Sequence, residues 1–288
     1  MSFHPDWLVP GWQVPGVGAV MTTRHGGVSE GAFNSMNLRH GLGDDEPAVA
    51  ANLNTLARAA GVAPVWLNQV HGVRVLRLSP ADVQGGGPAD VQGGGLADVQ
   101  GGGLANVQVR GHAHEADASV TTEPGIACAV QVADCLPVLF AAPQGLGVGA
   151  AHAGWRGLAS GVLEATVQAL CDATRCEPAQ FQAWFGACIG PRQFEVGADV
   201  LEAFGVGPST GADAARFVPH GPGKWLANLP QLARDRLAAA GVTRITGGDW
   251  CTVETPSRFF SYRRDRVTGR MAALVWIDPR VGRAIRGR

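Results

Sequence analysis

The sequence has few of the features that mark membrane, secreted or nucleic-acid-binding proteins. Charged residues make up only 16% of its 288 residues, and the net charge of −1 favours neither nucleic acid nor a membrane surface as a partner. No apolar run approaches the length that spans a membrane, and the first residues lack the basic start and apolar stretch of a secretory signal. We therefore expect a cytoplasmic protein that binds neither nucleic acid nor membranes.

Cysteine and lysine are also scarce. The six cysteines are spread along the chain without a CxxC pair, which argues against a disulfide scaffold, a zinc ribbon and a thioredoxin-like motif. Lysine occurs only at Lys224, so Schiff-base chemistry has a single candidate residue. The sequence contains no P-loop and no GxGxxG fingerprint. These absences exclude several common classes of nucleotide and cofactor site.

A Gly-rich repeat, ADVQGGGP-ADVQGGGL-ADVQGGGL-ANVQVRG, occupies residues 81 to about 111 with a period of eight. A calcium-binding β-roll is one interpretation, but each unit offers at most one aspartate as a ligand. Glycine triplets leave little side chain to bury. We therefore interpret the repeat as a surface insertion, and not as a boundary, in a single domain that covers residues 1–288.

Elsewhere, patterns typical of strands and helices alternate. An Asp cap, an early proline and a terminal glycine predict a helix over 44–61. Apolar periodicity predicts another from Leu158 to Leu170, and two more at about 196–204 and 229–240. Strands are expected at 17–23, 64–70, 73–78, 125–143 (one or two), 145–153 and 272–277. With no linker between them, these elements predict one α/β domain.

Two of the eight histidines, His71 in NQVHG and His152 in AHAGWRG, lie beside glycine at the ends of expected strands. Strand ends next to tight turns often carry the chemistry of α/β proteins, although a single such histidine is more often structural. Cys135, in VADCLPV, lies on the strand before that of His152. A hairpin between these strands would bring the cysteine and the histidine close together.

The register of this hairpin decides which residues face each other. A turn centred between Pro143 and Gln144 places Cys135 directly opposite His152, with Cβ atoms about 4.5–5.5 Å apart. A turn centred on Gln144-Gly145 places Gly154 opposite Cys135 instead. The sequence leaves both registers open, and a distance between Cys135 and His152 beyond about 8 Å would exclude shared metal ligation.

Three kinds of chemistry remain open for this group. A Cys/His/His set is typical of catalytic zinc, which keeps a fourth position open and lowers the pKa of water there. In that case Asp134 and Asn68 are expected to orient the imidazoles. Alternatively, Cys135 and His152 form a nucleophile–base pair, or Cys135 is an inert buried thiol. Spacing alone does not decide among them.

Polar loops around these strands offer candidate anion ligands. Arg24 lies in TTRHGGVSEGAFNSMNL, and Arg263 lies in RFFSYRRDRVTGR. Arg156 lies in GWRG, where free backbone N–H groups at the start of a helix would also attract an anion. Each segment is equally compatible with an ordinary turn or a solvated basic edge.

Seven motifs in order resemble the laccase-domain proteins: TTRHGGVSEGAFNSMNL, NQVHG, EADASVTT, VADCLPV, AHAGWRG, GACIGPRQFEVG and FFSYRRDRVTGRMA. The family was first named for multicopper polyphenol oxidases and was later reassigned to purine nucleoside phosphorylases that also deaminate adenosine. The resemblance runs from residue 20 to 274, apart from the repeat. It implies a fold of mixed β-sheets flanked by helices in one domain, in agreement with the pattern of elements.

The resemblance also implies a site and substrates. The family's metal ligands fall on His71, Cys135 and His152, with zinc as the metal and copper possible. The substrates would be phosphate and adenosine, inosine or methylthioadenosine, with adenosine deamination as a side activity. We expect Arg24, Asn68, Arg156 and Arg263 to bind substrate or phosphate, in a monomer or weak homodimer. The repeat can be looped out at small entropic cost, so we expect the site to survive it.

Other functions are compatible with parts of the sequence. A copper-dependent polyphenol oxidase needs about ten histidines, largely in HxH and HCH pairs, whereas this chain has eight, a single HxH pair and no HCH. A cysteine-dependent amide hydrolase would use Cys135 and His152 without metal. A non-enzymatic metal-binding or partner-binding module would be indicated by four saturated protein ligands.

Overall fold

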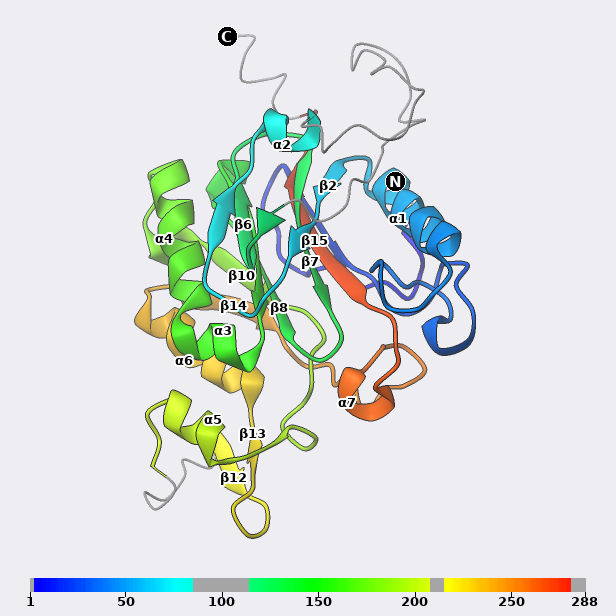
Figure 1. Cartoon of the computed structure of the whole chain (residues 1–288). Coiled ribbons are helices and arrows are strands. Elements are labelled where there is room, and N and C mark those ends of the chain that lie inside the picture. Colours follow the sequence, from blue (N-terminus) through cyan, green and yellow to red (C-terminus); the bar gives the residue numbers. More distant parts are fainter. Residues whose placement is uncertain (1–2, 85–113, 208–214, 281–288) are drawn as a thin grey trace.

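Two β-sheets lie face to face and carry helices on their outer faces (Figure 1). The structure, a computed structural model, describes residues 3–84, 114–207 and 215–280. The first sheet has the order β1 (Val17–Met21), β15 (Met271–Ile277), β7 (Ile126–Val132) and β2 (Ala63–Val65). The second has the order β14 (Arg244–Gly247), β10 (Gln182–Phe185), β8 (Leu136–Ala141), β9 (Val148–Ala153), β6 (Ala118–Thr121) and β4 (Val75–Arg77).

Helices and two small sheets complete the described part of the chain. One small sheet has the order β11 (Glu195–Val196), β13 (Trp225–Ala227) and β12 (Phe217–Pro219). The other consists of β3 (Leu67–Asn68) and β5 (His114–Glu115). The helices are α1 (Glu46–Ala60), α2 (Pro80–Gln84), α3 (Trp155–Ser160), α4 (Val162–Thr174), α5 (Ala198–Ala203), α6 (Leu229–Ala239) and α7 (Tyr262–Asp265).

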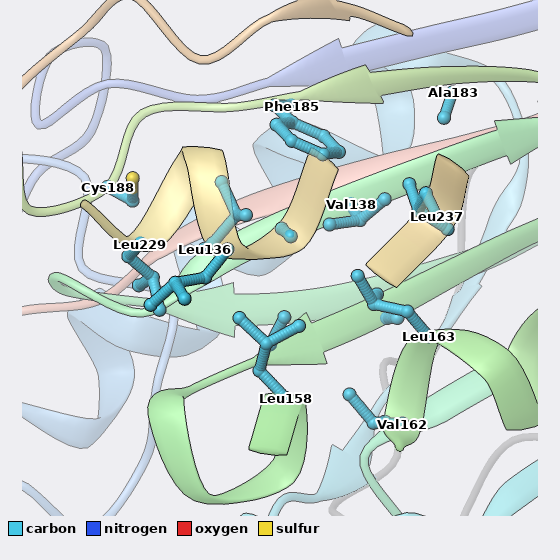
Figure 2. Close-up of a cluster of buried hydrophobic side chains, with 14 of the residues drawn as sticks. Leu136, Val138, Leu158, Val162, Leu163, Ala183, Phe185, Cys188, Leu229 and Leu237 are labelled. Atoms are coloured by element: carbon cyan, nitrogen blue, oxygen red, sulfur yellow. The ribbon is translucent and has the colours of Figure 1, made fainter. Parts of the chain in front are cut away.

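Alternating side chains build three layers of core around these sheets. On β7, Cys128 and Val130 pack between the two sheets, whereas Ala127 and Ala129 face the layer under α1. On the other sheet, Val138 and Phe140 face α3, α4 and α6. Figure 2 shows Leu136 and Val138 of β8 beside Leu158, Leu163, Phe185, Leu229 and Leu237. Strands buried on both faces read as continuous apolar runs, which explains the pattern of residues 125–143.

Most of the predicted elements are confirmed, and their ends follow from capping. The Asp45 side chain accepts the Ala48 N–H at the start of α1, and Gly61 ends that helix in the left-handed region at φ 68°. The helix expected from Leu158 to Leu170 is wrong in one respect, because it is two helices. Gly161 separates α3 from α4 at φ 101°, a conformation that side chains rarely adopt.

The fold class is confirmed: mixed β-sheets flanked by helices form one domain. The repeat interpretation falls mainly on residues 85–113, which lie outside the described residues, so the insertion and the extent of the domain over 1–288 stay predictions. Across the described ranges, no helix combines the length and apolar character that crossing a membrane requires.

Candidate metal centre

Three side chains converge at one end of the second sheet. One ligand atom from each of His71, Cys135 and His152 lies within 4.8 Å of the other two. The Cys135 Sγ atom is 3.6 Å from Nε2 of His71, and the two imidazole rings have centroids 4.8 Å apart. His152 is buried and His71 is exposed, so the group is reachable from solvent on one side. The residues proposed from the sequence therefore do lie together.

Of the two hairpin registers that the sequence left open, the structure has the second. Pro137, not Cys135, pairs with His152, and Leu136 pairs with Ala153, which corresponds to a turn centred on Gln144-Gly145. Both turn residues have positive φ, 56° and 69°, as in the two-residue turns whose twist suits a hairpin. Extending the pairing by one residue brings Gly154 opposite Cys135.

Gly154 explains how the group still assembles in this register. A Cβ atom at this position would lie 3.0 Å from Sγ of Cys135 and 2.5 Å from Cδ2 of His71. The space that a side chain would take is therefore filled by the thiol and the imidazole. Cys135 faces the gap at Gly154 and meets His152 diagonally.

Adding one methyl group at this position is expected to separate the ligands. Gly154→Ala should lower zinc content at least about tenfold in protein purified alongside wild type, because both contacts fall below normal van der Waals distance. Gly11→Ala is the matched control, since a Cβ atom there meets nothing within 4 Å. Unchanged zinc content in Gly154→Ala, measured by elemental analysis, would contradict this account of the packing.

A buried carboxylate that the sequence reasoning missed holds two of the three ligands. Asp117 precedes β6 and accepts the N–H groups of Val70, His71 and Gly72 at 3.1, 2.9 and 2.7 Å. Its Oδ1 atom also lies 2.8 Å from Nδ1 of His152. Asp117 thus fixes the loop that carries His71 and leaves Nε2 of His152 as the free ring nitrogen.

Asp134 and Asn68, which were expected to orient the imidazoles, have other surroundings in the structure. The Asp134 carboxylate accepts the Thr252 hydroxyl at 2.6 Å and the backbone N–H of Arg263 at 2.6 Å, so it ties the turn before Cys135 to α7. Asn68 is exposed at the end of β3. The interpretation of Asp134 as a partner of an imidazole is therefore wrong, and Asp117 has that role for His152.

The loop that carries His71 is also clamped to the first sheet. The Gln69 side chain accepts the N–H of Gln131 and donates to its carbonyl, both at 2.8 Å. The amide of Gln69 therefore replaces a neighbouring strand at the end of β7, just beyond its pairing with β2. His71 itself has φ 62°, a left-handed conformation that non-glycine residues hold only when their surroundings impose it.

Charge coupling within the group favours an ionised thiol. Burial raises the pKa of Cys135, but the charge and hydrogen bond of His152, with those of His71, outweigh burial and lower it to about 6. Burial lowers the pKa of His152, but the Cys135 charge and the Asp117 hydrogen bond raise it to about 9. The Asp117 pKa is lowered, because hydrogen bonds from His152 and the backbone outweigh its burial. Thiolate is the form of cysteine that binds metals and attacks electrophiles.

The arginines singled out in the sequence lie in three places. Arg24 donates to the carbonyls of Asn34 and Pro256 at 2.9 and 2.8 Å and lines a hollow of about 360 Å³ that contains none of the three ligands. Arg263 donates to the Glu195 carbonyl at 3.0 Å.

Arg156 is exposed within the short helix α3, where its guanidinium carbon lies 4.5 Å from the centre of the Trp155 ring. Gly154 is the N-cap of α3, so GWRG forms the start of this helix.

The donor set fits zinc. Tetrahedral zinc with Zn–S of about 2.3 Å and Zn–N of about 2.0–2.1 Å separates sulfur from nitrogen by about 3.6 Å. The observed separation between Cys135 and His71 is 3.6 Å. Two imidazoles, one thiolate and an exposed side match a three-ligand site with an open position. No other group of three such side chains within ligand distance occurs among the residues that the structure describes.

Comparison with known sequences gives one family and several close relatives. The family described as multi-copper polyphenol oxidoreductase laccase matches residues 18–278. Purine nucleoside phosphorylase PA4543 of Pseudomonas aeruginosa is 42% identical over 274 residues, covering 94% of this chain and 98% of its own. Purine nucleoside phosphorylase YfiH of Escherichia coli is 45% identical over 273 residues, with the same coverage.

Solved structures agree with the fold. Protein NMB0706 of Neisseria meningitidis is 40% identical and superimposes with a TM-score of 0.78 over 95% of this chain and 99% of its own. YlmD of Geobacillus stearothermophilus is 30% identical, with a TM-score of 0.80 over 96% and 98% of the two chains. The similarity therefore extends over nearly the whole chain.

Proposed function

This chain belongs to the multi-copper polyphenol oxidoreductase laccase family, and on that premise we propose that it is a zinc-dependent purine nucleoside phosphorylase. Its substrates are phosphate and adenosine, inosine or methylthioadenosine, and it deaminates adenosine as a side activity. The observation that carries the proposal is the open group of His71, Cys135 and His152, in a chain more than 40% identical to proteins named purine nucleoside phosphorylase.

In this proposal His71, Cys135 and His152 hold the metal. When bound, zinc supplies a Lewis acid that polarises a substrate atom or lowers the pKa of water. Asp117 keeps the Nδ1 side of His152 hydrogen-bonded, so the Nε2 lone pair stays directed at the group. Copper remains a possible occupant, because imidazole and thiolate bind it strongly.

The four remaining residues from the sequence stay predictions for the same reaction. Asn68 is exposed and lies three residues before His71 in the sequence. Arg24, Arg156 and Arg263 stay predictions as groups that bind substrate or phosphate. A monomer or weak homodimer in the cytoplasm is also part of the proposal.

The number of metal sites weighs against a copper-dependent polyphenol oxidase. That chemistry uses a blue-copper site and a separate trinuclear cluster. The described residues contain one group of three potential ligands and no second group. One mononuclear centre suits hydrolytic and group-transfer chemistry better than four-electron oxidation.

A second candidate is a cysteine-dependent amide hydrolase. It is favoured by the arrangement in which His152 lies between Cys135 and Asp117. His152 is oriented by a buried carboxylate 2.8 Å from Nδ1, and the thiol pKa falls to about 6. A nucleophile, a base and an orienting acid in series are typical of such enzymes. Activity that survives chelation but is lost on alkylation by iodoacetamide would favour this candidate over the metal enzyme.

Product identity distinguishes the proposals in one assay. Purified protein of known zinc content is incubated with adenosine, with and without phosphate, and the products are separated. We expect adenine and ribose 1-phosphate that depend on phosphate, with a smaller yield of inosine. Both activities should disappear on chelation and return with zinc. Absence of any phosphate-dependent product from zinc-loaded protein would refute the phosphorylase.

A further inference from the structure

Two arginines that the sequence reasoning did not single out, Arg39 and Arg270, are held together by one buried asparagine. Oδ1 of Asn37 accepts the backbone N–H of Arg39 at 3.2 Å and that of Arg270 at 2.9 Å. Nδ2 of Asn37 donates to the Arg39 carbonyl and to Asp44, at 3.2 and 2.8 Å. Asn37 therefore holds the backbones of two arginines together, although their segments are more than 200 residues apart in the sequence.

Neither of these guanidinium groups forms an ion pair with a carboxylate in the part of the chain that the structure describes, although the charge of Asp134 acts on Arg270 and raises its pKa. Arg270 donates to the carbonyls of Thr268 and Gly269, at 3.0 and 3.2 Å, and Arg39 donates to Oε1 of Gln131 at 3.5 Å. The arginines that do pair with carboxylates there are Arg192, Arg216, Arg236, Arg264 and Arg280.

Burial makes this arrangement costly without an anion. Both Arg39 and Arg270 are half-buried, and burial lowers the pKa of each guanidinium. The charge of Arg39 lowers the pKa of Arg270 further. Two like charges partly removed from water repel, and an anion between them reverses that penalty. Guanidinium groups also match the geometry of phosphate oxygens.

The pair borders the metal centre. Arg270 leads into β15, whose first residue, Met271, pairs with Val132, three residues before Cys135. Arg39 contacts Gln131, and Gln131 is bonded through its backbone to Gln69, two residues before His71. Both arginines are therefore tied to the strand and the loop that deliver the ligands. The charge of Cys135 also acts on Arg270, raising its pKa against the effect of burial.

We propose that Arg39 and Arg270 form the binding site for the phosphate dianion beside the metal centre. This inference rests on the proposed phosphorylase function and adds the residues that hold its second substrate. In phosphorolysis a phosphate oxygen bonds to C1′ of the ribose while the bond from C1′ to the purine nitrogen breaks. The purine leaves with the bonding electron pair and takes the proton that hydrogen phosphate gives up.

The test compares Arg39→Gln and Arg270→Gln with a matched surface variant, Arg58→Gln, on zinc-loaded protein. Arg58 is exposed in the last turn of α1 and lies outside the ligand group. Two quantities are measured: the dissociation constant of inorganic phosphate without nucleoside, by calorimetry, and the KM for phosphate in adenosine phosphorolysis. We expect each Gln variant to raise both the dissociation constant and the KM for phosphate by about tenfold or more, since each variant loses charge-assisted hydrogen bonds. The KM for adenosine, the zinc content and Arg58→Gln should match wild type.

Conservative variants separate binding from folding. Arg39→Lys and Arg270→Lys retain the charge and should recover part of the lost phosphate affinity, even if a Gln variant proves unstable. Phosphate affinity and KM that stay at the wild-type value in all four variants would overturn the inference while leaving the phosphorylase intact. Phosphate binding that depends on both arginines, in a protein that forms no ribose 1-phosphate, would support the anion site and refute the proposed function.

Discussion

Replacing Cys135 by alanine is expected to remove bound zinc and to lower the phosphorolysis rate by about a thousandfold or more. The thiolate is the only anionic ligand of the group, and its lowered pKa of about 6 keeps it ionised at neutral pH. Two imidazoles alone leave the metal with too few protein ligands. Zinc per chain and the initial rate of ribose 1-phosphate formation should be measured on the same sample.

Cys128→Ala is the matched control for this prediction. Cys128 is also buried, on β7, but burial raises its pKa to about 12 and it lies outside the ligand group. Its loss should destabilise the fold by about 1–2 kcal/mol, through a small cavity, and leave zinc content unchanged. Full phosphorolysis by metal-free Cys135→Ala protein would refute the role of the metal.

Replacing Asp117 by alanine is expected to have the largest effect on stability. The buried carboxylate accepts three backbone N–H groups and the His152 ring, and all four would lose their partner. Breaking such a buried charged network costs about 3–5 kcal/mol. In addition, zinc affinity should fall by about 10- to 100-fold, because neither imidazole remains oriented. Urea unfolding of chelated protein and a zinc titration measure the two effects separately.

The pH dependence gives a further check on Asp117. Its folded pKa lies below the unfolded value of about 3.9, so the stabilisation is fully present above that value. It is lost as the pH falls through the lowered folded pKa, where both states bind the proton. The difference in the free energy of unfolding between wild type and Asp117→Ala should therefore become smaller in acid. Asp172→Ala, at an exposed position on α4, should change stability by less than about 0.5 kcal/mol. Equal stabilities of Asp117→Ala and Asp172→Ala at pH 7 would contradict this account.

Local signals predicted the elements well because their causes lie within a few residues. The cap at Asp45, the proline in the first turn of α1 and the stop at Gly61 are all contained in a short window of sequence. The break at Gly161 was missed, because a glycine inside an apolar helical pattern is often tolerated. Here it takes φ 101° and turns one expected helix into two.

The site was predicted in its residue types but not in its geometry. Cysteine and histidine near strand ends indicated a metal centre, and the two ligands do lie together. Their register depends on whether a turn begins one residue earlier or later, and Gln144 adopting a positive φ is a weak signal in sequence. The ligands still meet because Gly154 has no side chain, so Cys135 can approach His152 diagonally and need not lie directly opposite it.

Asp117, Arg39 and Arg270 were missed for a different reason. Each acts through contacts that join distant segments: Asp117 meets His152 across the pairing of β6 with β9, and Asn37 joins the two arginines. A carboxylate directly before an apolar strand was the available signal for Asp117. Nothing local identifies which histidine it meets, because that depends on which strands become neighbours.

The convergence of three distant segments at the end of the second sheet has a consequence for how the protein matures. Cys135 and His71 are 64 residues apart in sequence, and they meet only once the strands on either side of them have found their places. Pairings of such long range form slowly and late in folding. The protein can therefore bind the metal only after its strands have reached their native pairing. The rate at which refolding protein takes up zinc should report its final folding step.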